Sequence, residues 1–306
     1  MIELSIVCPV YNEQDNIDLF LSRLETELIK LNMTFEIIFV NDGSTDNTLH
    51  KLENAKERLS QIRIINLSRN FGKEAALTAG LDYSTGEIII PIDADLQDPP
   101  ELIPDLVNEW KKGFNVVLAK RTDRGTDTIF KKLTADLFYK THNKISPIKI
   151  PDNCGDFRLI TRTVANAIQQ LPENQRFMKG VFAWVGFNVS YVNYSRDSRS
   201  AGKTKFNAWK LWNFALDGIT SFSTAPLRVW LYIGVIVAAL AFVYGGGIMI
   251  RTLVYGVDVP GYASLLTSIL FLGGIQLISI GILGEYIGRI YMEVKSRPKY
   301  IVEREL

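Results

Sequence analysis

Short apolar runs alternate with amphipathic helical patterns over the first 120 or so residues of the chain. The runs typical of strands cover residues 4–8, 35–40, 62–66, 87–92 and 116–119. Helical patterns lie between them, at residues 15–31, 45–59, 73–83 and 100–112. This alternation predicts an α/β domain with a mostly parallel sheet that is covered by helices on both faces. A further helix is expected at 128–143, and a short strand leading into a helix at 155–171.

Two long apolar runs, at residues 229–250 and 263–287, lie near the end of the chain. Each is close to the roughly 20 residues that cross a bilayer as a helix. Either run alone could be a buried core helix, but two in succession predict a transmembrane hairpin. Basic residues gather after the second run, at Arg289, Lys295, Arg297, Lys299 and Arg304. The positive-inside rule therefore places the α/β domain and the segment after the hairpin in the cytoplasm, at the cell membrane.

An amphipathic segment at residues 205–222 joins the α/β domain to the first apolar run. Trp209, Trp212 and Leu216 share one helical face, and Lys210 and Asp217 lie on the other. Such a helix could pack on the domain, but its place beside a membrane span favours the headgroup layer. We therefore expect an α/β catalytic domain over 1–204, an interfacial helix over 205–225, the hairpin over 226–290 and a cytoplasmic tail over 291–306.

The overall composition excludes several classes of protein. The chain carries 34 basic and 33 acidic residues, so its charge does not indicate a nucleic-acid partner. Two cysteines, Cys8 and Cys154, are too few for a disulfide framework and fit a reducing compartment. The only histidines, His50 and His142, are far apart in the sequence, which disfavours a histidine zinc site or a serine-hydrolase triad.

Acidic and amide side chains follow the fourth expected strand at alternate positions. Asp93, Asp95 and Gln97 would lie on one face if this segment were extended. Three oxygen ligands, with water and a phosphate completing the shell, suit Mg²⁺ or Mn²⁺. The alternative is a solvated loop whose acids start the next helix. Because open α/β sheets bind ligands at the carboxyl ends of their strands, we favour a metal site.

Two more strand-end loops, at residues 7–13 and 40–46, accompany the Asp93 segment. Each loop alone is a weak signal, but together they resemble the family 2 glycosyltransferases, over residues 2 to about 205. The resemblance implies a nucleotide-sugar-binding domain of the GT-A type. The segments 69–73, 93–101, 155–159 and 196–205 are similar to the branch that transfers sugars to polyprenyl and dolichyl phosphates. With the hairpin, the chain most resembles bacterial enzymes that load glucose onto undecaprenyl phosphate.

This resemblance assigns roles to individual residues. It implies a UDP-sugar site formed by Pro9, Tyr11, Glu13, Asp42, Lys73 and Asp93. It implies a divalent cation, Mg²⁺ or Mn²⁺, bound by Asp93, Asp95 and Gln97, and catalytic roles for Asp95, Asp156 and Arg158. Simpler interpretations stay open: Tyr11 could serve packing, Glu13 could start a helix, and Lys73 could be a solvated helix lysine.

A lipid phosphate acceptor sets a particular chemical requirement. A phosphate monoester has a second pKa of about 6, so it is mostly dianionic and already nucleophilic at neutral pH. The enzyme must therefore bring a dianion to a diphosphate-sugar, which needs cations more than a strong base. Two basic groups could provide them. The first lies just after the fifth expected strand, and the second lies before the hairpin: Arg121, Arg124, Lys131 and Lys132, and Arg196, Arg199, Lys203 and Lys205.

The expected reaction is a single inverting displacement, in which Asp156 orients the sugar or an acceptor-binding cation. The donor could instead be GDP-mannose, a UDP-N-acetylhexosamine or an aminopentose nucleotide, because loop geometry decides sugar choice. A non-catalytic nucleotide-sugar-binding scaffold that recruits a flippase is the alternative outside the enzyme class. Glycines such as Gly245, Gly273 and Gly281 allow close helix contacts, so a homo-oligomer is expected.

Overall fold

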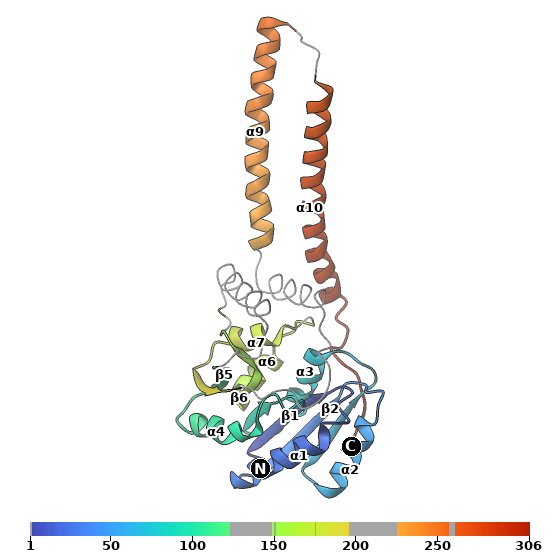
Figure 1. Ribbon diagram of the computed structural model, residues 1–306, viewed down its shortest axis with the longest axis vertical. Coiled ribbons are helices and arrows are strands. Elements are labelled where there is room, and N and C mark those ends of the chain that lie inside the picture. Colours follow the sequence, from blue (N-terminus) through green and yellow to red (C-terminus); the bar gives the residue numbers. More distant parts are fainter. Residues whose placement is uncertain (1, 123–148, 150, 175, 196–224, 257–260) are drawn as a thin grey trace.

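The computed structural model describes residues 2–122, 149, 151–174, 176–195, 225–256 and 261–306 (Figure 1). An α/β domain lies at one end of the molecule, and two long helices extend away from it. The helix expected at 128–143 lies outside the described residues, and so does the interfacial helix expected at 205–225, except for residue 225.

One mixed sheet of eight strands forms the centre of the domain. Its spatial order is β7-β5-β6-β4-β1-β2-β3-β8. The central strands β4, β1, β2 and β3 are parallel, whereas β6 runs antiparallel to β4 and β5, and β8 antiparallel to β3. The strands are β1 Leu4–Val10, β2 Phe35–Asn41, β3 Ile62–Leu67, β4 Ile88–Pro91, β5 Val116–Arg121, β6 Cys154–Thr161, β7 Val189–Tyr194 and β8 Val302–Glu305. The five strands expected in the first part of the chain are confirmed, and β7 and β8 were not expected.

Helices cover both faces of the sheet. The first layer holds α1 (Ile17–Lys30), α2 (Thr48–Arg58) and α4 (Ile103–Lys111), the last preceded by the 3₁₀ turn η1 (Pro100–Leu102). The other holds α3 (Lys73–Tyr83), α6 (Arg162–Gln169) and α7 (Met178–Trp184). Alternate strand residues supply the two cores: Ile6 of β1 packs in the first layer, and its neighbour Val7 packs under α3. This arrangement confirms the α/β fold with a sheet covered on both sides.

The two apolar runs form long helices, α9 (Ala225–Tyr255) and α10 (Tyr262–Val294). Each contains a stretch of 24 residues that is long and apolar enough to cross a membrane, Tyr232–Tyr255 and Phe271–Val294. Where the side chains are described, none in the apolar window of either stretch is buried within the protein, so the surroundings must accommodate them. In α10, Arg289 pairs with Glu285 at 3.0 Å, one helical turn apart.

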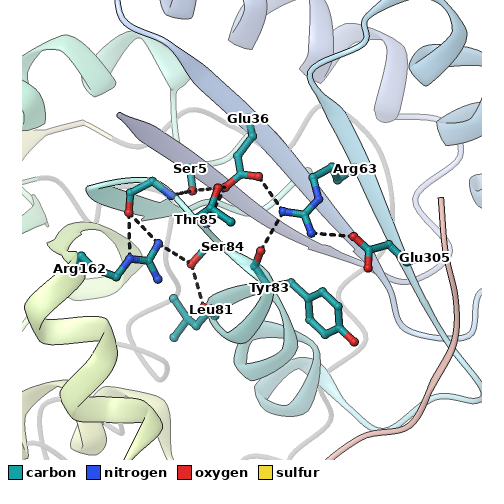
Figure 2. A network of polar contacts seen from close by, with 10 residues as sticks. Ser5, Glu36, Arg63, Leu81, Tyr83, Ser84, Thr85, Arg162 and Glu305 are labelled. Atoms are coloured by element: carbon teal, nitrogen blue, oxygen red, sulfur yellow. Dashed lines mark hydrogen bonds and ion pairs between the residues drawn. The ribbon is translucent and has the colours of Figure 1, made fainter. Parts of the chain in front are cut away.

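The segment after α10 returns to the α/β domain as the edge strand β8 (Figure 1). Glu293, at the end of α10, accepts the backbone N–H of Asn174 at 2.9 Å. Figure 2 shows the far end of β8, where Arg63 donates to Glu36 at 2.8 Å and to Glu305 at 2.6 Å. Glu36 is buried and also accepts from Ser5 at 2.6 Å. The carboxyl terminus therefore lies with the α/β domain, and residues 291–306 are not a separate tail.

Candidate active site

The site lies at the carboxyl ends of the parallel strands, where the loops after β1 and β2 are tied together. Asn12 adopts a left-handed backbone with φ 53°, and its side-chain oxygen accepts the Thr45 N–H at 2.8 Å. Its own N–H donates to Ser44 Oγ at 3.0 Å, and the Glu13 N–H donates to Thr48 Oγ1 at 2.9 Å. These two loops were expected to share one sheet edge, and the structure confirms that they do.

Asp42 joins a third loop to this pair. Its carboxylate is buried and accepts the backbone N–H groups of Phe71 at 2.7 Å and Gly72 at 2.9 Å. Burial raises the pKa of the Asp42 carboxyl, and these two hydrogen bonds offset part of that rise. Gly43 has φ 64°, and a Cβ there would come within 2.5 Å of the Arg69 backbone, so only glycine fits. The Asp42 carboxylate thus holds the loop that begins α3, and its place in a UDP-sugar site stays a prediction.

Lys73, the first residue of α3, connects two carboxylates from different strands. Its Nζ lies 2.7 Å from Asp93 Oδ2, just after β4, and 2.8 Å from Asp156 Oδ2 on β6. Lys73 is therefore paired with both carboxylates at the carboxyl edge, while its side chain stays 46% exposed. The structure brings together three residues that the sequence argument named from three separate motifs.

The charges around Asp156 keep it ionised. Burial alone would raise the pKa of the Asp156 carboxyl, but the positive charges of Lys73 and Lys179 outweigh it, and the pKa lies well below its usual value. In the same way, Asp156 and Asp93 outweigh burial and hold the pKa of the Lys73 ammonium well above its usual value. Asp156 Oδ1 is buried and has no hydrogen-bond partner among the described residues.

Two charged residues that the sequence motifs did not indicate lie beside this cluster, Glu74 and Lys179. Glu74 follows Lys73 on α3 and accepts the backbone N–H of Met178, at the start of α7, at 3.2 Å. Burial and the neighbouring Asp156 charge raise the pKa of Glu74 to about 7. Lys179 comes from α7, an element that the sequence patterns did not predict, so only the fold could place it here.

The extended geometry expected from Asp93 to Gln97 is wrong. Strand β4 ends at Pro91, and the chain turns at Leu96, which has φ 59° and is fully buried. The Gln97 N–H donates to Asp95 Oδ1 at 3.1 Å across this turn. In the described part of the chain, no three histidine, cysteine or carboxylate side chains are grouped to hold a metal. Asp93 and Asp95 are the two carboxylates of this segment, so the rest of a cation's shell would have to come from a bound ligand and water.

Asp98 and Arg158 face the protein. Asp98 is buried and accepts the Tyr194 hydroxyl of β7 at 2.5 Å. Arg158 is also buried; it donates to the carbonyls of Gly155 at 2.6 Å and Asp156 at 3.3 Å, and stacks on Phe182. Arg158 thus supports the backbone that carries Asp156, and its catalytic role stays a prediction.

The remaining predicted residues divide into described and undescribed ones. Pro9 lies on β1 opposite Val40, Tyr11 is half-buried in the following loop, and Glu13 accepts from Asn16 at 2.7 Å. Arg121 ends β5 and donates to the Tyr194 hydroxyl at 3.4 Å. The other predicted acceptor-phosphate residues lie outside the described residues: Arg124, Lys131, Lys132, Arg196, Arg199, Lys203 and Lys205.

Comparison with known proteins agrees with this geometry. Residues 5–169 match the family described as Glycosyl transferase family 2, and residues 225–290 match the GtrB C-terminal hairpin. The chain is 57% identical to an uncharacterized glycosyltransferase of Synechocystis, over 98% of this chain and 95% of the relative. It is 54% identical to a prophage bactoprenol glucosyl transferase homolog of Escherichia coli, over 99% of each. It is also 54% identical to the bactoprenol glucosyl transferase of Shigella phage SfII, over 99% and 98%.

Among solved structures, a mannosyltransferase from Pyrobaculum calidifontis in complex with GDP-Man and Mn²⁺ shares the fold. The TM-score is 0.52 at 14% identity, over 95% of this chain and 87% of that one. The assignment follows from the sequence identity to glycosyltransferases over nearly the full length of the chain. The match of residues 5–169 and of the hairpin to family models agrees with it. The chain is an enzyme of glycosyl transferase family 2, with a GT-A-like domain and a carboxyl-terminal GtrB hairpin.

Proposed function

We propose that this enzyme transfers glucose from UDP-glucose to undecaprenyl phosphate at the cytoplasmic face of the cell membrane. The observation that carries the proposal is the Lys73 bridge between Asp93 and Asp156 at the carboxyl edge of the sheet. It gathers an ammonium and two carboxylates where α/β sheets bind nucleotides. The names of the full-length relatives support glucose as the sugar and bactoprenol, a polyprenyl carrier, as the acceptor.

The donor diphosphate would lie beside the Lys73 ammonium and the Asp93 carboxylate. Asp93 and Asp95 would hold a divalent cation, with Gln97 beside them on the turn. When bound, Mg²⁺ or Mn²⁺ offsets the negative charge that grows on the departing UDP. Lys73 supplies a second positive charge for the same purpose, from a helix whose start is fixed by Asp42.

Asp156 orients substrate in this mechanism. Its lowered pKa makes it a weak base at neutral pH, and a dianionic acceptor phosphate carries no proton that must be removed before attack. The buried Oδ1 atom, without a partner in the described part of the protein, is available to a hydroxyl of the donor sugar. A phosphate oxygen then attacks the anomeric carbon from the face opposite UDP, which inverts its configuration.

The acceptor reaches the site from the membrane. Two apolar helices extend from the α/β domain, and α10 contacts that domain through Glu293 and Asn174 (Figure 1). A polyprenyl chain in the bilayer would therefore present its phosphate close to the domain surface. The basic groups around Arg121 and 196–205 would bind that phosphate.

The proposal is tested with the purified full chain in nanodiscs that contain undecaprenyl phosphate. UDP-glucose, UDP-N-acetylhexosamines, an aminopentose nucleotide and GDP-mannose are supplied one at a time with Mg²⁺ or Mn²⁺, and lipid products are identified by mass spectrometry. We expect a hexosyl phosphate lipid from UDP-glucose at a rate far above the other donors. A faster reaction with another donor would replace glucose, and binding without any lipid product would favour a scaffold.

A further inference from the structure

A row of side-chain amides connects the carboxyl-terminal strand to the donor loop. Asn66, on β3, donates through Nδ2 to Glu303 Oε2 on β8 at 2.6 Å. Asn41, at the end of β2, donates through Nδ2 to Asn66 Oδ1 at 2.7 Å. Asn41 Oδ1 in turn accepts the backbone N–H of Ser44 at 3.3 Å. Asn41 and Asn66 are 1% and 5% exposed, so water cannot easily replace the contact between them, whereas Glu303 is exposed at the end of the row.

The Glu303 carboxylate at one end of the row fixes its direction, that is, which way the NH₂ group and the oxygen of each asparagine point. An asparagine side chain has a donor end and an acceptor end, and it could be turned either way between neutral neighbours. A carboxylate only accepts, so Glu303 requires the NH₂ group of Asn66 to face it. The Asn66 oxygen must then face Asn41, whose own oxygen faces the Ser44 N–H. In the reverse direction the Asn41 NH₂ group would oppose the Ser44 N–H, and two donors would meet.

A β-bulge places Glu303 at the end of this row. Asn66 pairs with Arg304, but the next residue, Leu67, pairs with Val302, so Glu303 is the extra residue on β8. Bulges turn a side chain away from the regular alternation of a strand. The bulge is held by its neighbours: the Ser68 N–H donates to the Ile301 carbonyl at 3.0 Å, and the Tyr300 hydroxyl donates to Asp82 at 2.9 Å.

Resting on the proposed function, we propose that Glu303 is a positioning residue for donor binding. It acts through Asn66 and Asn41 on Ser44, the loop residue that also accepts from Asn12 at 3.0 Å. The same loop carries Asp42, which fixes the start of the helix that presents Lys73. The segment that leaves the membrane helix α10 thereby completes the nucleotide-binding edge of the sheet.

The test reverses the direction of the row and then restores it. Glu303→Lys places a hydrogen-bond donor opposite the Asn66 NH₂ group, which requires an acceptor. We expect the KM for UDP-glucose to rise about tenfold and kcat to change little. A tenfold rise corresponds to the loss of about one hydrogen bond to a charged group. Asn66→Asp added to Glu303→Lys restores the direction, because the new carboxylate accepts from both the lysine and Asn41. The double variant should recover most of the donor affinity. Glu303→Gln, which keeps an acceptor oxygen, should lie near wild type.

Glu305→Gln is the matched control. Glu305 is on the same short strand and pairs with Arg63 at 2.6 Å, but it lies outside the row. Its substitution loosens the strand without reversing any amide, so the donor KM should not change. An equal rise in KM for Glu305→Gln, or no recovery in the double variant, would overturn the proposal, because strand docking alone would then explain the effect.

Hydrogen exchange of the 41–48 segment gives a readout that does not depend on catalysis. Glu303→Lys should speed exchange of the Ser44 amide, and Asn66→Asp in the same chain should slow it again. If the enzyme proves to use another donor or acceptor, this exchange result still stands, and only the proposed function fails. Unchanged exchange in Glu303→Lys would refute the positioning role whatever the substrate is.

Discussion

Replacing Lys73 by methionine removes the cation that separates Asp93 and Asp156. Each carboxylate has an oxygen within 2.8 Å of Nζ, so the two charges face each other when the ammonium is gone. With the carboxylates about 5 Å apart and an effective dielectric constant of about 20, their repulsion is about 3 kcal/mol. The Lys73 side chain is 46% exposed, so water screens part of this energy and we expect a loss of about 1–2 kcal/mol of stability at pH 7.5.

The pH dependence of this loss has a defined sign. In Lys73→Met, repulsion raises the folded-state pKa of one carboxyl above its unfolded value, so the penalty is present above that raised pKa. It fades as the pH falls towards about 4, where the unfolded carboxyl also takes up a proton. Thermal unfolding of wild type and variant at pH 7.5 and at pH 5 measures the change, with a smaller difference expected at pH 5.

The same substitution should reduce glucosyl transfer strongly. Loss of one positive group at a developing charge typically costs about a hundredfold or more in rate. We expect kcat/KM to fall about a hundredfold in Lys73→Met and about tenfold in Lys73→Arg, which keeps the charge on a different shape. Transfer from labelled UDP-glucose to undecaprenyl phosphate is the assay. Activity of Lys73→Met within threefold of wild type would refute the role assigned to this ion-paired cluster.

Three further predictions concern the role of Asp156, the divalent cation and the buried ion pair of Glu36. Asp156→Asn should lower kcat/KM about tenfold to a hundredfold without removing a limb from the pH–rate profile, because Asp156 is already ionised; a limb that disappears in the variant would make Asp156 the base. EDTA should abolish transfer, and Mg²⁺ or Mn²⁺ should restore it; full activity in EDTA would contradict a cation requirement. Glu36→Gln should cost about 2 kcal/mol in denaturant unfolding, because Arg63 loses a buried partner. Burial raises the pKa of Glu36, but hydrogen bonds from Ser5, Arg63 and Thr85 outweigh burial and lower it. The difference in unfolding free energy between wild type and Glu36→Gln should therefore narrow below about pH 4, where the carboxylate takes up a proton. A difference that stays constant with pH would argue against the ion pair.

The sequence predicted those parts of the fold that periodic patterns encode. The first five strands are buried apolar runs, and Lys73 begins its helix at the expected residue. Strand β8 has the sequence Val-Glu-Arg-Glu, and a short charged edge strand carries no apolar signal because one side faces water. Strand β7 alternates exposed and half-buried residues, and its pairing with β5 depends on chain far away in the sequence.

The site was predictable as a set of residues but not as a geometry. The positions of the motifs predicted that Asp93, Asp156 and Lys73 lie at one sheet edge, because strand ends and helix starts share that edge. The left-handed backbone at Leu96 could not be expected, because glycine or asparagine is the usual residue there. Burial of the Leu96 side chain compensates for that backbone, and such compensation is visible only once the core is assembled.

The most direct test of the proposed reaction is the structure of the product. The full chain is incubated in nanodiscs with UDP-glucose, undecaprenyl phosphate and a divalent cation, and the lipid product is analysed by mass spectrometry and by NMR of its anomeric proton. We predict one hexose linked through phosphate to the polyprenol, in the β configuration that inversion of an α-linked donor produces. An α-linked product would contradict the single displacement, and glucose found on any acceptor other than the lipid phosphate would contradict the proposed function.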